Sequence, residues 1–378
     1  MRILAVNAGS SSLKLRVLDD ANRLCEFVDL PALEGASERG ALQDALEGLG
    51  TVDAVGHRIV HGGLEFTGPA RIDDAVVRRL WALSDLAPLH QPPALHALDA
   101  VTAAFPEAPA VACFDTAFHT TLLPAAATYA IPPQWRRRWA LRRYGFHGLS
   151  HQYAARRAAE LVGRPPADLL LVSCHLGSGA SLAAVAGGRS VDTTMGFTPL
   201  EGLVMATRSG SLDPGLVLWL QEHVGTPAAE LASTFEHRSG LLGLAGSADM
   251  REVQSMADAG EPDAALAIDV YIHHLRAGVA AMVAAMGGLD ILLFTGGVGE
   301  HSPDVRQRSG AGLGFLGVQI DPDRNRGGGG SPVGAPHPLD RVISPAGSSV
   351  VALVVESRED LEIAREVRTV LEADRHLS

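Results

Sequence analysis

The chain has 378 residues, of which 47% are hydrophobic and 20% are charged. This balance is typical of globular proteins with a sizeable core, and it excludes an intrinsically disordered chain. The length suits two domains of ordinary size. The formal net charge of −12 argues against a nucleic-acid-binding surface, which requires a large basic patch, but local arginines could still bind a small anion.

The cysteines and the apolar runs indicate a cytoplasmic protein that is not embedded in a membrane. Cys25, Cys113 and Cys174 are far apart, and their spacing is typical of neither a zinc site nor a disulfide framework. The apolar run before Asn7 is too short for the core of a signal peptide. The longest apolar stretch, residues 277–294, is interrupted by paired glycines and by Asp290, so it does not predict a bilayer span.

In the first half of the chain, short β-rich runs alternate with longer helical ones, which predicts an α/β fold. Residues 2–6 and 13–19 predict two strands of a hairpin joined by a Gly-Ser turn. Residues 53–63 and 110–119 each predict a strand that runs into a loop. Residues 150–163 predict a helix that stops at its final glycine.

The second half continues this alternation. Residues 168–194 predict two strands around a Gly-Ser turn and a third strand after a Gly-Gly pair. Residues 263–288 predict a long, mostly buried helix that paired glycines cap. Residues 289–308 predict a strand, a glycine turn and a helix.

Near the end of the chain, residues 323–340 are rich in glycine and proline. This composition predicts a mobile surface loop. Only one predicted strand, within 348–356, and one predicted helix, 357–374, follow it, which is too little for a further domain.

Two segments, 2–20 and 169–188, share one plan. Each consists of an apolar strand, a polar residue, a Gly-Ser turn, a leucine and a second strand. A repeat of this kind is expected for two related domains with a cleft between the copies. Chance similarity between two Gly-Ser hairpins is the other interpretation, and the repeat alone leaves both open.

Two glycine-rich segments could bind phosphate or a nucleotide. The turn at residues 9–12 offers backbone N–H groups and hydroxyls, which suit phosphate oxygens, but it lacks the spacing of a Walker loop. A serine-rich hairpin turn is the simpler interpretation. In residues 294–306, glycines allow a flat ligand to approach the backbone, and Ser302 followed by Pro303 predicts a helix start. A nucleotide site and a tight strand-to-helix turn are equally compatible with this pattern.

Several histidines lie near glycines, prolines and predicted strand ends: His57, His61, His90, His119, His147 and His151. Their spacing matches no common metal-binding motif. A single histidine of this kind is more often a structural hydrogen-bonding residue, whereas their concentration at strand ends favours the lining of a cleft.

Charged residues near predicted strand ends are further candidates. Arg58 lies in an apolar strand and Arg208 in a polar loop. A buried arginine needs an anionic partner, which could be a substrate phosphate or carboxylate, or an internal Asp or Glu. Asp115 follows an apolar strand and could hold Mg²⁺ through water or stabilise a turn. Glu356 and Glu359, at the last strand-to-helix junction, could do either.

Taken together, the chain resembles the acetate kinase family. Ten segments carry this resemblance in the family's order: VNAGSSSLK, GHRIVHGG, APLH, FDTAFH, YGFHGLSH, HLGSGAS, GFTPLEGL, TRSGSLDP, FTGGVGE and EDLEIAR. They extend over nearly the whole chain, so the resemblance is far more specific than any one glycine loop.

The resemblance implies a fold of two duplicated actin-like (ribonuclease H-like) domains, with mixed sheets flanked by helices and the active site in the interdomain cleft. The N-terminal domain would comprise residues 1–119 and 361–378, and the nucleotide-binding C-terminal domain residues 120–360. The family is homodimeric, which implies a homodimer here. The resemblance further implies reversible, in-line phosphoryl transfer from ATP to acetate, giving acetyl phosphate and ADP, with Mg²⁺ or alternatively Mn²⁺ as the metal ion.

Carried over by position, the resemblance implies four groups of site residues. The implied catalytic residues are Arg58, Asp115, His147 and Arg208, with His90 as a further active-site histidine. The implied carboxylate-binding residues are Arg58, Val60, Leu89, Phe146 and Pro199. The implied nucleotide-binding residues are Ser10, Ser12, Lys14, His175, Gly177, Ser178, Gly179, Asp249, Met250, Arg251, Gly297, Val298, Gly299 and His301. The implied metal site contains Asn7, Glu359 and Asp115, the last with a second role in orienting acetate.

The chain departs from the family pattern at several positions. Ser178 stands where the family usually has Asn, Ser211 where it has Asp, Ala206 where it has Gly, and His301 where it has Asn. These departures bear on nucleotide preference and catalytic strength. Two alternatives to an acetate kinase therefore remain. The first is a kinase for propionate or another short-chain carboxylate, although Val60 narrows the pocket and so favours acetate. The second is a nucleotide-binding homologue without kinase activity.

Overall fold

The computed structural model describes residues 1–9, 12–32, 36–86, 91–327 and 339–377. Backbone contacts divide the chain into two units. The first comprises Met1–Thr120, Phe146–Tyr153 and Arg358–Ser378, and the second comprises Thr121–Gly145 and Ala154–Ser357. The short segment from Phe146 thus belongs to the first unit, although it lies within the predicted C-terminal domain. The predicted domain limits themselves stay a prediction.

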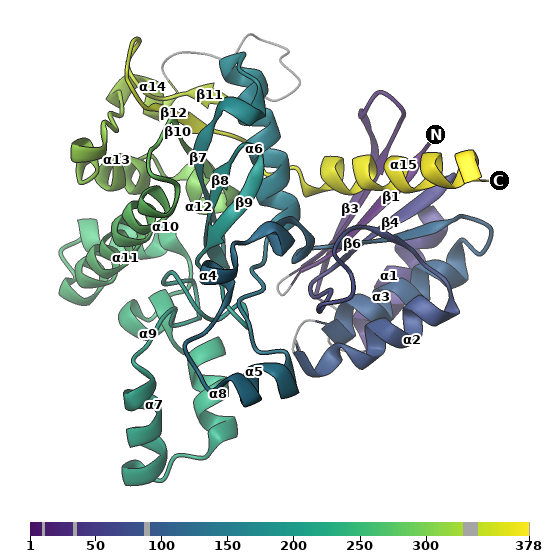
Figure 1. The fold of residues 1–378 in the computed structure, drawn as a ribbon, viewed down its shortest axis with the longest axis horizontal. Helices are drawn as coiled ribbons and strands as arrows, with labels where there is room; N and C mark the ends of the chain where they lie inside the picture. The colour runs from purple at the N-terminus through teal and green to yellow at the C-terminus, as the bar shows by residue number, and fades with distance from the viewer. Residues whose placement is uncertain (10–11, 33–35, 87–90, 328–338, 378) are drawn as a thin grey trace. The chain divides into compact units, whose positions relative to one another are not determined.

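The first unit is built on a six-stranded mixed sheet (Figure 1). In spatial order, its strands are β3 (Leu24–Pro31), β2 (Ser12–Leu18), β1 (Ile3–Ala8), β4 (Ala54–Ile59), β6 (Ala110–Phe114) and β5 (Ala70–Arg71). β1, β2 and β3 are antiparallel neighbours, β4 and β6 continue the sheet in parallel with β1, and β5 is antiparallel to β6. The strands predicted in the first half of the chain are confirmed.

The second unit contains another six-stranded mixed sheet. In spatial order, its strands are β11 (Arg341–Val342), β12 (Val351–Val354), β10 (Ile291–Thr295), β7 (Leu170–Leu176), β8 (Ala180–Ala186) and β9 (Arg189–Thr193). β7, β8 and β9 are antiparallel neighbours, β10 and β12 are parallel to β7, and β11 is antiparallel to β12. The three strands predicted from residues 168–194 are confirmed.

The two sheets have the same topology, strand for strand. In each, the chain makes three antiparallel strands, then a parallel strand, a short antiparallel edge strand and a last parallel strand. The Gly-Ser hairpins of the sequence repeat, β1–β2 and β7–β8, occupy equivalent places. The duplication interpretation of the repeat therefore agrees with the fold, and the predicted α/β class with two mixed sheets is confirmed.

Helices cover both faces of the first sheet. They are α1 (Ala36–Gly48), α2 (Asp74–Ala82), α3 (Gln91–Ala104) and α15 (Glu359–Leu377), with short 3₁₀ turns at η1 (Ser84–Leu86) and η2 (Ala117–Thr121). Figure 1 shows α15 across the sheet, where it packs on β1, β4 and β6.

Gly56 of β4 permits this close packing, because a Cβ at this position would lie 2.3 Å from the side chain of Ile363 on α15. Side chains alternate between the faces of a strand, so Arg58 shares the α15 face with Gly56. The opposite face is apolar, and it packs on α1 and α3 through residues such as Val55 and Leu98.

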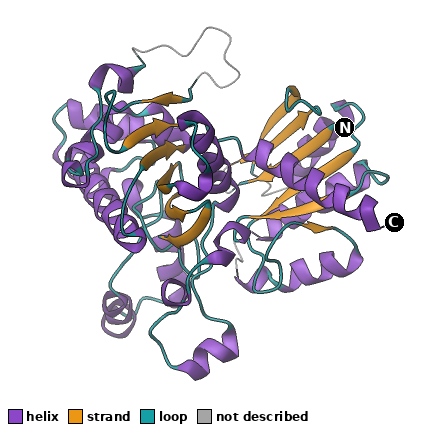
Figure 2. Ribbon diagram, turned by 45° about the horizontal axis from the view of Figure 1, so that its top comes forward, coloured by secondary structure: helices purple, strands orange, loops and turns teal. Residues whose placement is uncertain are grey.

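The second unit carries most of the helices, and Figure 2 shows them around its strands. They are α4 (Pro124–Ala127), α5 (Pro133–Trp139), α6 (Gly148–Val162, which begins in the first unit), α7 (Pro214–Trp219), α8 (Ala228–His237), α9 (Gly240–Ala245), α10 (Met250–Asp258), α11 (Pro262–Met286), α12 (Gly296–His301), α13 (Pro303–Ala311) and α14 (Pro322–Arg326). Shorter turns are η3 (Pro166–Asp168), the π-helical η4 (Leu220–Val224) and η5 (Gly314–Leu316).

Helix α11 is the long apolar helix predicted from the sequence, and it ends at Gly287 in a left-handed cap. Its buried side chains recur at helical spacing, from Ala264 to Val283, and it packs on β8, α9 and α10. By length and composition α11 could cross a bilayer, with a mean hydropathy of 1.2, but 44% of that window is buried inside the protein. Core helices commonly pass the same test.

Two expectations require correction. The glycines after β10 form a shorter turn than predicted: only Gly296, with a φ of 79°, has the left-handed conformation of a turn, and the helix α12 follows at once and ends at His301. Residues 323–340 are not one loop either, because Asp323–Arg326 belong to α14, where Asn325 is 2% exposed. Asp340 is also buried. Residues 328–338 of that predicted loop lie outside the described part of the chain.

Candidate active site

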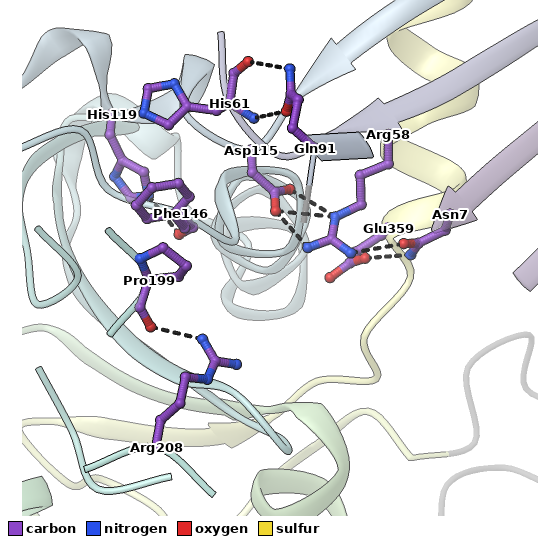
Figure 3. Close-up of polar contacts among 10 residues, drawn as sticks. All are labelled: Asn7, Arg58, His61, Gln91, Asp115, His119, Phe146, Pro199, Arg208 and Glu359. Carbon is purple, nitrogen blue, oxygen red and sulfur yellow. Dashed lines mark hydrogen bonds and ion pairs between the residues drawn. The ribbon is translucent and has the colours of Figure 1, made fainter. Parts of the chain in front are cut away.

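Arg58 and Asp115 form a buried ion pair at the ends of two neighbouring parallel strands (Figure 3). Arg58 lies in β4, and Asp115 directly follows β6. The Arg58 guanidinium donates from Nε to both carboxylate oxygens at 3.1 Å and from Nη2 to Oδ2 at 2.6 Å. Asp115 is 1% exposed. Of the partners considered for Arg58, the structure shows the internal carboxylate.

Burial and charge act in opposite directions on this pair. Burial raises the pKa of Asp115 above its ordinary value, against the lowering effect of the Arg58 charge. Burial alone would lower the pKa of Arg58, but the charges of Asp115 and Glu359 raise it above its ordinary value. Arg58 is therefore a permanent, largely desolvated positive charge.

Asn7 and Glu359 extend this network from β1 and α15. The Asn7 Oδ1 accepts from Arg58 Nη1 at 3.0 Å, and its Nδ2 donates to Glu359 Oε2 at 2.5 Å. Figure 3 shows the four side chains as one chain of polar contacts within the first unit. Three strands and the first turn of α15 thus direct acidic, amide and guanidinium groups to the same place.

Amide and carboxylate oxygens are the ligands that Mg²⁺ and Mn²⁺ prefer. Among the described residues, no group of three or more His, Cys, Asp or Glu side chains could hold a metal ion. Mg²⁺ usually keeps several waters and binds through one or two protein oxygens together with substrate phosphates. The adjacent Asn7 and Glu359 side chains fit this mode of binding.

His147 is held in an unusual backbone conformation beside Asp115. Its φ is 55°, a left-handed region that non-glycine residues rarely adopt. The backbone N–H of His147 bonds to the Asp115 carboxylate, and its carbonyl oxygen accepts from His151 N–H at 2.9 Å. At Gly148, an added Cβ would lie 2.1 Å from the Asp115 carbonyl oxygen. Such strain clusters at functional sites.

Three other histidines of the first unit, His57, His61 and His119, are buried, and burial favours their uncharged form. Burial lowers the pKa of His57 to about 3, of His61 to about 4 and of His119 to about 4. Nδ1 of His61 accepts from Gly63 N–H at 2.9 Å, and Nε2 of His119 donates to the Phe146 carbonyl at 3.0 Å. These contacts agree with the structural interpretation of a histidine at a strand end.

The predicted pocket residues of the first unit are also buried. Val60 is 7% exposed and Phe146 is 1% exposed. The ring of Phe146 lies edge-on to His61, with centroids 5.6 Å apart. Leu89 and His90, the other predicted residues of this region, lie outside the described residues.

Arg208, in the second unit, is buried in a loop that many backbone hydrogen bonds hold. Its Nη1 donates to the carbonyl oxygen of Pro199 at 2.7 Å (Figure 3). Its own carbonyl accepts from Met205 N–H at 3.1 Å, and Gly240 packs so closely that a Cβ would lie 2.2 Å from the Met205 carbonyl oxygen. The loop thereby places a guanidinium beside Pro199.

The Gly-Ser turns of the two hairpins differ in length by one residue, because the last strand pair is Ala8 with Leu13 in the first hairpin and Leu176 with Ala180 in the second. Gly9 N–H donates to the Ser12 carbonyl at 2.8 Å, and Gly177 N–H donates to the Gly179 carbonyl at 2.9 Å. Lys14 and Ser178 are exposed. Ser10 lies outside the described residues, so only the rest of the first turn can be compared.

A second glycine segment, α12, is held at both ends by buried charged residues. Oε1 of Glu300 accepts from Gly296 N–H at 2.8 Å and from Ser357 N–H at 2.9 Å. Nη1 of Arg306 donates to the carbonyls of Gly299 at 2.7 Å and Glu300 at 2.9 Å. As predicted, Ser302 caps the next helix, with its Oγ accepting from Val305 N–H at 3.3 Å.

The remaining predicted nucleotide residues differ in their exposure. Asp249 caps α10 and pairs with Arg251 at 2.5 Å, where these contacts lower the Asp249 pKa to about 2. Met250 between them is buried. His175 is the last residue but one of β7, two residues before Gly177, and His301 is 62% exposed.

Comparison with known proteins places this arrangement in a family. The sequence profile described as the Acetokinase family matches residues 32–365. The chain belongs to the acetokinase family. The acetate kinase of Leifsonia xyli subsp. xyli is 45% identical, with 96% of this chain and 97% of that protein covered. The predicted family is thus confirmed.

Solved structures of acetokinase relatives have the same fold. The Porphyromonas gingivalis acetate kinase superposes with a TM-score of 0.87 at 34% identity, covering 98% of this chain and 99% of that one. A propionate kinase from Francisella tularensis subsp. tularensis also has a TM-score of 0.87 at 34% identity, covering 97% and 99%. The predicted actin-like architecture agrees with these structures.

Sequence reasoning missed several residues that hold the acetokinase site in place. Gln91 is 0% exposed and bonds to both the N–H and the carbonyl of His61, at 3.2 Å each. Glu300 and Arg306 support α12, and a cluster around Glu201 supports the loop of Pro199. For Glu201, Glu300 and Arg306 the available signal was a charged residue inside an otherwise apolar or glycine-rich segment, whereas the neutral Gln91 gave no such signal.

Proposed function

We propose that this chain is an acetate kinase, which transfers the γ-phosphoryl group of ATP reversibly to acetate and so forms acetyl phosphate and ADP. Membership of the acetokinase family makes it an ATP-using kinase with a carboxylate acceptor. The observation that carries the proposal is the network of Asn7, Arg58, Asp115 and Glu359, because it gathers a permanent cation and oxygen ligands at one set of strand ends.

The residues suit phosphoryl transfer through a loose transition state, which needs alignment and compensation of charge more than covalent chemistry. Arg58 and Arg208 would bind acetate and the transferring phosphoryl group, and His147 would donate to its oxygens. Acetate is already ionised at neutral pH, so it needs no strong general base. Asp115 would orient Arg58 and the acetate.

Asn7 and Glu359 would hold Mg²⁺, or Mn²⁺, with Asp115 close by. When bound, the ion supplies charge compensation on the phosphate oxygens. The hydrogen bond from Asn7 Nδ2 to Glu359 Oε2 at 2.5 Å supports this assignment, because it places the two side chains next to each other. The Asn7 oxygen, Oδ1, accepts from Arg58 Nη1 at 3.0 Å. Glu359 also begins α15, so its place depends on the packing of that helix.

The nucleotide would be bound by three segments. The Gly-Ser turns, through Ser10, Ser12, Lys14, His175, Gly177, Ser178 and Gly179, would face the phosphates. The α10 cap, with Asp249, Met250 and Arg251, and the helix α12, with Gly297, Val298, Gly299 and His301, would contact the adenosine. Gly297 is exposed in the first turn of α12, which supports this proposal, since a glycine leaves room for a flat base.

Acetate is proposed as the preferred acceptor, with Val60, Leu89, Phe146 and Pro199 around its methyl group. The β-branched Val60 leaves little space for a longer chain. One methylene changes binding by only about 1–3 kcal/mol, so some activity with propionate is expected, and the Francisella tularensis relative is a propionate kinase by name. Comparing kcat/KM for acetate, propionate and butyrate tests this choice, and a preference for butyrate would contradict it.

We further propose a homodimer that works in the cytoplasm. The second unit exposes large apolar side chains on α7 and η4, namely Leu216, Leu218, Trp219 and Val224. Exposed apolar clusters of this kind are typical of protein–protein contacts. A second copy of the chain is the partner that the family resemblance indicates.

The hydroxamate assay tests the proposed activity, with ATP, Mg²⁺ and acetate as substrates and hydroxylamine as the trap. We expect acyl hydroxamate from the wild type and a loss of about a hundredfold in rate for Arg208→Ala, since one electrostatic group contributes about 3 kcal/mol to the barrier. Arg164→Ala, which removes an exposed ion pair with Asp290, is the control. Near-normal activity of Arg208→Ala would contradict the assigned role, and no turnover of any carboxylate by the wild type would contradict the function.

A further inference from the structure

A polar cluster outside the proposed chemistry ties together two segments of the second unit. Glu201 accepts from the Tyr129 hydroxyl at 2.6 Å through Oε2 and from Arg143 Nη2 at 2.7 Å through Oε1. Arg143 also donates from Nη1 to the carbonyls of Thr194 at 2.9 Å and Met195 at 3.1 Å. The Glu201 carboxylate thus has both oxygens occupied by donors from the 129–143 segment.

The carboxylate determines the direction of the Tyr129 proton. Since the hydroxyl donates to Glu201, its oxygen lone pairs are free to accept, and they accept the Phe197 N–H at 2.8 Å. Burial, together with Glu201, raises the pKa of Tyr129, so the phenol stays protonated and remains a donor. Through this relay, Glu201 holds the backbone of Phe197.

Gly196 shows how tightly the cluster is packed. A Cβ at this position would lie 1.7 Å from Glu201 Oε2 and 2.1 Å from the Tyr129 hydroxyl oxygen. The Gly196 carbonyl accepts from the N–H groups of Tyr144 at 3.0 Å and Gly145 at 3.3 Å. The backbone at residue 196 is therefore clamped between the cluster and the 143–145 segment.

Both clamped segments lead directly to residues of the proposed carboxylate pocket. Pro199 lies between Phe197 and Glu201 in the loop, and its carbonyl accepts from Arg208 at 2.7 Å. Phe146 follows Gly145 immediately in the chain. A small shift at the cluster would therefore move Pro199 and change the angle at which Arg208 is held.

We propose that Glu201, acting through Tyr129 and Arg143, is a positioning residue that shapes the carboxylate side of the site and sets its selectivity for chain length. This inference rests on the proposed function. Among the described residues, the side-chain partners of Glu201 are Tyr129 and Arg143, and neither is proposed to bind a reactant, so its loss would act on the carboxylate pocket through Pro199 and leave the nucleotide segments unchanged. A displacement of about 1 Å in a positioning group can cost as much as about a hundredfold in rate.

The test compares Tyr129→Phe, Glu201→Ala and the double variant. Each single change breaks the relay to Phe197, while Tyr129→Phe keeps the Glu201–Arg143 ion pair and adds no cavity. We expect the KM for acetate to rise about tenfold, the propionate-to-acetate ratio of kcat/KM to rise, and the KM for ATP to stay within about twofold.

The double variant should be no worse than Glu201→Ala, because the effects of residues in one relay are not additive. Glu201→Gln, which can still accept the phenol proton, should restore part of the acetate KM.

Asp290→Asn provides a matched control, because Asp290 is a similarly exposed carboxylate that pairs with Arg164 and accepts the Leu170 N–H at 2.8 Å. It should leave both KM values unchanged. Unaltered acetate KM and chain-length selectivity in Tyr129→Phe would overturn the inference, as would a parallel rise in the KM for ATP. If Glu201→Ala does not fold, Tyr129→Phe alone decides. A wild type that phosphorylates no carboxylate would overturn both the inference and the proposed function. An active wild type with an unaltered Tyr129→Phe variant would overturn the inference alone, so the two failures can be told apart.

Discussion

At the scale of single residues, two buried carboxyl groups between the first sheet and α15 differ in whether a cation pairs with them. Asp115 has the Arg58 guanidinium within 2.6 Å, whereas Glu366 of α15 is 4% exposed and its Oε2 has no partner among the described residues. Glu366 faces the Cys113 thiol, with Glu362, Arg365 and Asp115 near enough to act on its charge. Burial raises its pKa from 4.5 to about 7, so its ionised form is disfavoured in the fold.

Glu366→Gln should therefore change how stability depends on pH. A raised carboxyl pKa contributes stability that is complete below the unfolded value of about 4.5 and is lost as pH rises through the folded value of about 7. The loss in the wild type amounts to about 3 kcal/mol, and the glutamine variant avoids it. We expect the variant to gain stability over the wild type from pH 5 to pH 8 in urea unfolding.

Glu372→Gln is the control for this measurement, because Glu372 lies on the same helix but is exposed. It should follow the wild type at every pH. If Glu366→Gln and the wild type lose stability in parallel as the pH rises, the ionisation of Glu366 does not cause the loss.

At the scale of elements, α12 depends on one buried arginine. Arg306 is 1% exposed and its described partners are the carbonyls of Gly299, Glu300 and Asn325 and the Asn325 side chain. The guanidinium binds the last carbonyls of a six-residue helix, where cations are favoured. Burial lowers the Arg306 pKa to about 10, so it still keeps its charge at neutral pH.

Arg306→Met should uncouple α12 from α14. Removing the guanidinium leaves several buried carbonyls without donors, and each such group costs about 1–3 kcal/mol. We expect a clear fall in Tm and weaker ADP binding by calorimetry, with the acetate KM less affected. Arg306→Lys should not restore the fold, because an ammonium lacks the planar fork.

The neighbouring Arg308→Met serves as the matched control, because Arg308 is 36% exposed and pairs with Asp269 on the surface. It should leave Tm and ADP affinity near the wild-type values. Full ADP affinity in a folded Arg306→Met variant would refute the role of Arg306 in supporting a nucleotide segment.

At the scale of the whole molecule, two sheets of one topology carry different additions. The second unit adds α7, η4, α8, α9 and α10 between β9 and α11, and these include exposed large side chains such as Leu218 and Trp219, which are 56% and 51% exposed. The first unit has a comparatively short connection between equivalent strands. The proposed dimer contact therefore lies in a segment that has no counterpart in the first sheet.

Sedimentation velocity checks the homodimer. The wild type should sediment with twice the mass of one chain, and a Leu218→Asp, Trp219→Asp double variant should shift toward monomer, because desolvating two carboxylates in an apolar contact is unfavourable. Phe315→Asp is the control, since Phe315 is 76% exposed on η5, in another part of the unit. A wild type that sediments as a monomer would contradict the proposal, as would a double variant that stays dimeric.

The sequence by itself determined the local elements and the family. Alternation of apolar residues predicted the β1–β2 and β7–β8 hairpins, and glycines marked the ends of α6 and α11, because these signals arise from neighbours along the chain. Ten ordered motifs identified the acetokinase family and named Arg58, Asp115 and His147 as candidates.

Only the tertiary structure decided which charges meet. The sequence left the partner of Arg58 open between a substrate and an internal acid, because Asp115 is far away along the chain and approaches it only through the pairing of β4 and β6. The supporting hydrogen bonds of Gln91, Glu201 and Arg306 could not be predicted from the sequence either, since a hydrogen bond between distant segments leaves no periodic pattern in it. Equally, the glycines after β10 predicted a longer turn, but only Gly296 turns the chain, because Glu300 and Arg306 satisfy both ends of the short helix α12 there.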